Sequence, residues 1–121
     1  MILVVDDNPS IREIIELSLS ASNYRVCCVE NGREALAVME REVPRLVILD
    51  LSMPGMSGYE VLAHIRNLDA SRHVPVICLS ALPPEEERER VLKEGARDYL
   101  SKPFHIPDLL ECVRIHAEQE G

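Results

Sequence analysis

Acidic, hydroxyl and basic residues stand directly after short apolar runs in this sequence. Asp6 and Asp7 follow ILVV, and Asp50 follows LVIL. Ser80 follows VPVICL, and Lys102 lies just beyond the weaker run DYL. Like charges about 4 Å apart repel by roughly 4 kcal/mol at an effective dielectric of 20. If these positions meet in the fold, the three carboxylates therefore need a counter-charge.

The residue types suggest phosphoryl transfer onto an aspartate. Lys102 supplies one positive charge, and Mg²⁺ suits a site of carboxylates, a backbone carbonyl and water. A carboxylate beside Mg²⁺ and a lysine can attack phosphorus, because both cations offset the charge on the phosphoryl oxygens. The hydroxyl of Ser80 could donate a hydrogen bond to the same oxygens. The alternative, that strand ends are simply polar, explains any single one of these residues better than the whole set.

The apolar runs alternate with helical patterns along the chain. They cover residues 2–5, 26–29, 46–49, 74–79 and 98–100. Nearly continuous Val, Ile and Leu is typical of strands buried on both faces. Strand followed by helix, five times over, predicts a doubly wound five-stranded parallel α/β sheet with five helices. The flavodoxin-like strand order 2-1-3-4-5 places the working crevice beyond the carboxyl ends of the strands.

Capping residues predict where the helices begin and end. Asn8 precedes a proline, Asn31 precedes Glu34 by three residues, Ser57 and Glu60 form a capping-box pattern, and Gly95 marks a helix end. The helix over 85–95, EEERERVLKEG, offers only Val91 and Leu92 to a core. We expect it to be weakly anchored, although its charge run also fits an ordinary solvated face.

Length and charge limit the function classes. The 121 residues suit one domain spanning 1–121. The net charge, 13 minus 21 or -8, argues against nucleic-acid or membrane binding by this chain, though not by another domain of a longer protein. No apolar run approaches the ~20 residues of a membrane span, and the N-terminus does not resemble a signal peptide. We expect a cytoplasmic location.

The cysteines and histidines show no metal-binding spacing. Cys27, Cys28, Cys78 and Cys112 are predicted to be buried free thiols rather than disulfides or metal ligands. The four histidines, at 64, 73, 105 and 116, are predicted to be solvated or on helix surfaces.

From ILVVDDNPSIRE to DYLSKPFHIPDLL, the sequence resembles the receiver domain of two-component response regulators, the chemotaxis-regulator type included. The resemblance implies that Asp50 is the phosphoacceptor. It implies Mg²⁺ (or Mn²⁺) bound directly by Asp7, Asp50 and the backbone carbonyl of Ser52, with Asp6 acting mainly through water.

The resemblance assigns the other site residues as well. Ser80 would move toward the phosphoryl group, small Ala81 would leave room for that movement, and Lys102 would pair with the phosphoryl oxygens. The Lys102–Pro103 peptide bond would be cis, and Tyr99 would be the aromatic rotamer switch that fills the space left by Ser80.

The implied function is a signalling switch rather than an enzyme. A histidine kinase, a phosphotransfer protein or a small phosphodonor supplies the phosphoryl group. The surface of the helix over 85–95, the strand over 98–100 and the last helix then shifts, and this controls an output domain or a partner protein. Kinase docking would involve Ile11, Ile14, Pro103 and Phe104. Plain core packing is the alternative for Ile14 and Leu17.

Further features and alternatives remain open at this point. Leu82 is apolar where many members of the family are polar, which predicts a long-lived phosphoryl state. Arg97 and Cys112 depart from receivers that dimerise through the last two helices. A degenerate receiver would lack one of the key residues. A flavin binder would need a glycine- and hydroxyl-rich loop in place of DDNPS, and a haloacid-dehalogenase-type phosphatase would need D-x-D after the first strand.

Overall fold

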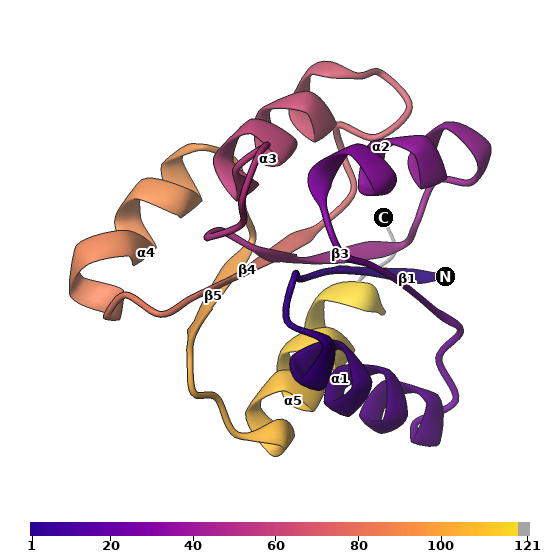
Figure 1. The fold of residues 1–121 in the computed structure, drawn as a ribbon, viewed down its shortest axis with the longest axis vertical. Coiled ribbons are helices and arrows are strands. Elements are labelled where there is room, and N and C mark those ends of the chain that lie inside the picture. Colours follow the sequence, from indigo (N-terminus) through magenta and orange to yellow (C-terminus); the bar gives the residue numbers. More distant parts are fainter. Residues whose placement is uncertain (119–121) are drawn as a thin grey trace.

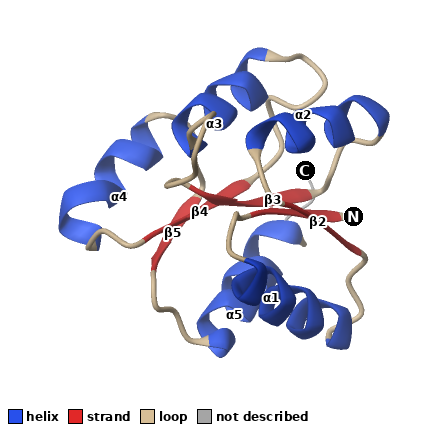
Figure 2. Ribbon diagram, viewed as in Figure 1, coloured by secondary structure: helices blue, strands red, loops and turns tan. Residues whose placement is uncertain are grey.

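A computed structural model describes residues 1–118, in which strands and helices alternate. The strands are Ile2–Val5 (β1), Val26–Val29 (β2), Leu46–Asp50 (β3), Val76–Ser80 (β4) and Asp98–Ser101 (β5). The helices are Pro9–Ala21 (α1), Gly32–Arg41 (α2), Gly58–Asn67 (α3), Pro84–Lys93 (α4) and Ile106–Ala117 (α5). The parallel strands pair in the order β2-β1-β3-β4-β5, which confirms the predicted doubly wound fold (Figure 2).

Helices cover both faces of the sheet. Helices α2, α3 and α4 lie on one face, and α1 and α5 lie on the other (Figure 1). Alternate residues of each strand enter different cores: Leu3 and Val5 pack toward α2 and α3, whereas Ile2 and Val4 pack toward α1 and α5. Burial on both faces explains why the central strands are uninterrupted apolar runs.

The strand register brings the polar strand ends to one edge. Val5 pairs with Leu49, so Asp6 and Asp50 follow side by side on neighbouring strands. Both Asp50 and Ser80 are the last residues of their strands, whereas the apolar runs predicted the strands to end one residue earlier. Strand β4 also begins at Val76 rather than at residue 74, because proline has no N–H for the ladder.

The helix boundaries follow the predicted capping signals. Asn8 accepts hydrogen bonds from two N–H groups of the first turn of α1, and Asn31 accepts one from Glu34. Ser57 and Glu60 form the predicted capping box at the start of α3. Gly95 has φ of +107°, a left-handed conformation that ends α4 at little cost for glycine.

Helix α4 is anchored differently from the prediction. Val91 is fully buried, but Leu92 is 36% exposed and does not join the core. Glu87 is buried instead and accepts a hydrogen bond from the hydroxyl of Tyr59 on α3. A single fully buried apolar side chain leaves α4 held partly by a polar contact that water can replace.

The cysteine prediction is partly wrong for burial. All four cysteines are free, and Cys78 and Cys112 are buried, but Cys27 and Cys28 are only half-buried because β2 is an edge strand. His116 lies on helix α5 but is less exposed than a solvated or helix-surface histidine. Its side chain is 14% exposed and its Nε2 lies 3.0 Å from Asp98. No helix within residues 1–118 combines the length and apolarity needed to cross a membrane.

The capping box of α3 should contribute measurably to stability. The backbone N–H of Glu60 donates to Ser57 Oγ at 3.3 Å, and the N–H of Ser57 donates to Glu60 Oε1 at 3.1 Å. We expect Ser57→Ala to lower the free energy of unfolding in urea by about 1 kcal/mol. Ser20→Ala, at an exposed position in α1, is the matched control and should change it by less than about 0.5 kcal/mol. Equal effects of the two substitutions would argue against the capping role.

Candidate functional site

Three carboxylates meet at the carboxyl ends of β1 and β3. One oxygen from each of Asp6, Asp7 and Asp50 lies within 4.8 Å of the others. Asp6 and Asp50 are buried, with 0% and 2% exposure, and Asp7 is exposed to solvent. The cluster therefore has two carboxylates in the sheet edge and one open to ligands from solution.

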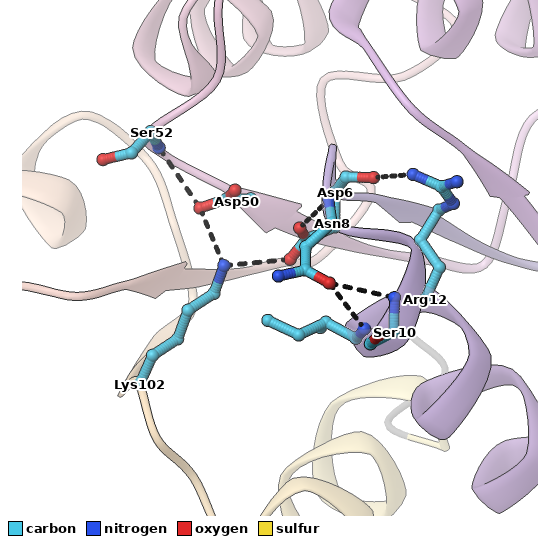
Figure 3. Close-up of polar contacts among 8 residues, drawn as sticks. Asp6, Asn8, Ser10, Arg12, Asp50, Ser52 and Lys102 are labelled. Carbon is cyan, nitrogen blue, oxygen red and sulfur yellow. Dashed lines mark hydrogen bonds and ion pairs between the residues drawn. The ribbon is translucent and has the colours of Figure 1, made fainter.

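Lys102 is the cation that pairs with this cluster. Its Nζ lies 3.0 Å from Asp6 Oδ2 and 3.3 Å from Asp50 Oδ1, between the two carboxylates (Figure 3). The lysine follows β5, and its backbone N–H donates to the carbonyl of Ser80 at 2.7 Å. The Lys102–Pro103 peptide bond is cis.

The start of α1 fixes the position of Asp6. The backbone N–H of Asn8 donates to Asp6 Oδ1 at 2.9 Å, and Arg12 Nη1 donates to the Asp6 carbonyl at 2.7 Å (Figure 3). The sequence reasoning missed Arg12. Arg12 lies one helical turn after Asn8, and side chains on a helix lean back toward the N-terminus of the helix. This position could have indicated that Arg12 reaches the loop before α1.

Asp50 is oriented by contacts to one of its two oxygens. Oδ1 accepts a hydrogen bond from the backbone N–H of Ser52 at 3.2 Å and also faces Lys102. Neither contact engages Oδ2. Burial and the charge of Asp6 raise the pKa of Asp50 to about 6, although Lys102 and the Ser52 N–H oppose this shift.

The loop after β3 turns back against the strand end. A Cβ on Gly58 would lie 2.5 Å from the carbonyl oxygen of Asp50, so only glycine fits there. The N–H of Gly58 donates to Leu51 O at 3.2 Å, and Gly55 has φ of +79°. The tight return keeps the loop from covering the Asp50 side chain.

The donor atoms of this cluster fit a hard divalent cation. Three carboxylates and one ammonium sum to 1 minus 3, or -2. Asp6 Oδ2 is buried and accepts no directed hydrogen bond within the described residues, so Lys102 compensates it only by charge. Carboxylate oxygens with access to water are the ligands that Mg²⁺ prefers.

Ser80, Leu82 and Tyr99 form a connected group on the β4–β5 side. Ser80 is buried, and its Oγ accepts a hydrogen bond from the N–H of Leu82 at 3.1 Å. The hydroxyl of Tyr99 donates to the carbonyl of Leu82. The Tyr99 side chain is already buried, at 3% exposure, so it needs no vacated space in order to enter the protein. Ala81 is exposed beside this group.

The predicted docking residues differ in exposure. Ile14 and Leu17 are 49% and 64% exposed, so the core alternative for these two residues is wrong. Ile15 and Leu19 form the buried face of α1 instead, because they point at the sheet. Pro103 is exposed, and the two others, Ile11 and Phe104, are partly buried against the core.

Comparison with known protein families gives a match over most of the chain. The family described as "Response regulator receiver domain" matches residues 2–114. The transcriptional regulatory protein HprR of Escherichia coli is 37% identical over 118 residues, which are 98% of this chain and 52% of HprR. The chain thus spans about half the length of that relative.

Solved structures share the fold over nearly their whole length. A putative response regulator from Chloroflexus aurantiacus is 30% identical with a TM-score of 0.92, covering 98% of this chain and 97% of that one. The receiver domain of the sensor histidine kinase PA1611 from Pseudomonas aeruginosa is 34% identical with a TM-score of 0.87, covering 96% and 95%. That structure has a magnesium ion coordinated in the active site cleft.

Removing the Asp50 charge should stabilise the fold when a chelator is present. We expect Asp50→Asn to raise the free energy of unfolding at pH 7 by about 1–3 kcal/mol, because a buried carboxylate beside Asp6 is lost. Millimolar Mg²⁺ should narrow this difference by stabilising the wild type. Denaturant unfolding with and without Mg²⁺ measures both effects.

The stability difference between the wild type and Asp50→Asn should depend on pH. The folded-state pKa of Asp50, about 6, lies above its ordinary value of 3.8, so the folded state binds more protons between these values. The wild type should lose stability relative to Asp50→Asn as the pH rises through this window. Asp69→Asn, at a fully exposed side chain, is the control and should show neither effect. A destabilised Asp50→Asn protein in chelator would contradict the assignment of repulsion.

Proposed function

The chain belongs to the response regulator receiver domain family, and from this premise we propose that it is a signalling switch phosphorylated on Asp50. The observation that carries the proposal is the environment of Asp50. This carboxylate stands at the sheet edge with Oδ1 held by Ser52 and Lys102, and with Oδ2 outside both contacts. A transcriptional regulatory protein and a putative response regulator among the similar proteins support the same proposal.

The proposed reaction transfers a phosphoryl group from a phosphohistidine or a small phosphodonor. An oxygen of Asp50 attacks phosphorus, a P–O bond forms, and the bond from phosphorus to the donor's leaving group breaks; in a phosphohistidine this is the P–N bond to the imidazole. The bonding electron pair stays on the imidazole nitrogen, which takes up a proton from water. Lys102 is already within 3.3 Å of Asp50 and offsets charge on the phosphoryl oxygens.

Mg²⁺, or Mn²⁺, would be held by Asp7, Asp50 and the carbonyl of Ser52, with Asp6 acting through water. When bound, the ion neutralises charge on the phosphoryl oxygens as the transition state forms. The clustered carboxylate oxygens and the magnesium in the cleft of the PA1611 receiver domain support this assignment. Asp6 and Asn8 position the acidic loop on which Asp7 lies.

The proposed switch passes from Asp50 to the α4–β5–α5 face through Ser80. New charge on Asp50 draws the ammonium of Lys102 and the hydroxyl of Ser80 toward the phosphoryl oxygens. Ser80 then releases the N–H of Leu82, whose carbonyl accepts the Tyr99 hydroxyl. Because Tyr99 is already buried, phosphorylation would stabilise this inward state rather than create it. The partly polar anchoring of α4 would let that helix shift.

The partners proposed are a histidine kinase or phosphotransfer protein on one side and an output domain or partner protein on the other. The exposed side chains of Ile14 and Leu17 support docking along α1, and Pro103 and Phe104 of the loop before α5 are proposed to take part. We propose that residues 1–121 form one receiver domain and that it acts in the cytoplasm. The net charge of -8 favours protein partners over direct nucleic-acid or membrane contact by this chain.

Beryllofluoride with Mg²⁺ tests the phosphorylation proposal, because it mimics a phosphoryl group on a carboxylate. Amide NMR shifts should change around Asp50, Ser80 and Tyr99 in the wild type. The Asp50→Asn variant should show no such response, while the exposed Asp69→Asn control should respond like the wild type. Absence of any response in folded wild-type protein would refute phosphorylation at this site.

The side chain at position 82 should set the lifetime of the phosphorylated state. Leu82 is 45% exposed next to Ser80, and a carboxylate there can orient water toward the acyl phosphate. We expect Leu82→Glu to speed loss of the phosphoryl group on the order of tenfold. Release of labelled phosphate measures the rate. Leu92→Glu, also exposed but on α4, is the matched control, and similar rates for both variants would contradict the role of Leu82.

A further inference from the structure

A second group of metal-ligating side chains joins β5 to α5. Asp98 comes from β5, and Cys112 and His116 come from α5. One ligand atom of each lies within 4.8 Å of the others. Cys112 Sγ and His116 Nε2 are 3.2 Å and 3.0 Å from the same oxygen, Asp98 Oδ2. The phosphorylation mechanism uses none of these three side chains.

The Asp98 carboxylate is oriented before any ligand arrives. Its Oδ1 accepts the backbone N–H of Tyr99 at 2.8 Å and faces Arg88 Nη1 at 3.4 Å. These contacts leave Oδ2 pointing at the thiol and the imidazole. Carboxylates that bind metals in proteins are commonly hydrogen-bonded by neighbouring groups as well.

The two residues on α5 have the spacing of helical metal ligands. Cys112 and His116 are four residues apart, which puts both side chains on the same face of the helix. Asp98 lies opposite them on the strand. The partial exposure of Asp98 and His116, at 27% and 14%, gives an ion access from solvent.

The two distances to Asp98 Oδ2 are close to those between adjacent ligands of a tetrahedral site. Bonds of about 2.3 Å to sulfur and about 2.0–2.2 Å to nitrogen and oxygen separate adjacent tetrahedral ligands by roughly 3.3 to 3.7 Å. The present separations are shorter by a few tenths of an ångström, because a thiol proton and an imidazole proton each point at the carboxylate. Binding would release the thiol proton to solvent and move the imidazole proton from Nε2 to Nδ1, and the ligand atoms would move apart by a few tenths of an ångström.

We propose that Asp98, Cys112 and His116 form a binding site for a borderline transition-metal ion of the Zn²⁺ class. Thiolate, imidazole and carboxylate together favour Zn²⁺ or Co²⁺ and disfavour Mg²⁺, which prefers oxygen ligands. Three protein ligands leave a fourth position for water or a ligand from a partner. Through Arg88 of α4, the carboxylate also connects the site to the third element of the α4–β5–α5 face.

A purely structural role, in which Cys112 and His116 only hydrogen-bond Asp98, predicts the same contacts. His116 Nδ1 is buried and has no hydrogen-bond partner among the described residues. This atom lacks a partner in either role, so it does not distinguish a hydrogen bond to Asp98 from metal binding through Nε2. A direct binding experiment separates these two roles.

Titration with Co²⁺ provides a specific readout. The experiment uses reduced, tag-free protein treated with chelator, with excess Mg²⁺ to occupy the acidic site. We expect one Co²⁺ per chain, an ultraviolet thiolate-to-Co²⁺ charge-transfer band and visible bands of tetrahedral type, all reversed by Zn²⁺. Zn²⁺ should also raise the thermal unfolding midpoint because the ion joins β5 to α5.

Substitutions assign the band to its ligands. Cys112→Ser should abolish the charge-transfer band, and Asp98→Asn and His116→Gln should each weaken Co²⁺ binding at least tenfold. His116→Gln, at a side chain near the surface, keeps the test decisive if Cys112→Ser fails to fold. Cys28→Ser, His64→Gln and Asp50→Asn are the matched controls and should bind like the wild type. No thiolate band in the wild type, or a band lost in Cys28→Ser and kept in Cys112→Ser, would overturn the proposal.

Discussion

The electrostatic imbalance at the carboxyl ends of β1 and β3 is the constraint on which the rest of the structure depends. Two buried carboxylates, Asp6 and Asp50, share one ammonium from Lys102, and a third carboxylate stands beside them. Repulsion among these carboxylates favours binding of a cation to the cluster, or a change that redistributes the negative charge of its members. A site kept in this state is poised to bind a cation and to respond to a new charge on one of its members.

The doubly wound topology makes this arrangement possible. Strand β1 lies between the edge strand β2 and the central strand β3, and the helices after β1 and β3 leave on opposite faces (Figure 1). The chain therefore diverges above Asp6 and Asp50, and their side chains are not covered by a connecting helix. The cost of burying the charges is met locally, by Lys102 and by the backbone N–H groups of Asn8 and Ser52.

Much of this could be predicted from the sequence, because it follows from local patterns. Continuous apolar runs specified the strands, and capping residues such as Ser57 specified the helix starts. Contacts between distant parts of the chain could not be predicted from such local patterns. The burial of Glu87 depends on Tyr59 from a different helix, and the Asp98 cluster depends on how α5 packs on β5. The exposure of Ile14 was ambiguous because a widened apolar stripe fits either a core or a docking surface.

Both polar clusters converge on β5, and this bears on how they communicate. Lys102 follows the strand directly, while Tyr99 and Asp98 lie within it and face different neighbours. Asp98 accepts the backbone N–H of Tyr99, so any displacement of β5 at the proposed switch residue also moves the carboxylate that faces Cys112 and His116. By reciprocity, an ion that fixed Asp98 would bias the position of Tyr99. Strand β5 is thus the element through which charge at Asp50 and ligands at the α4–β5–α5 face can influence each other.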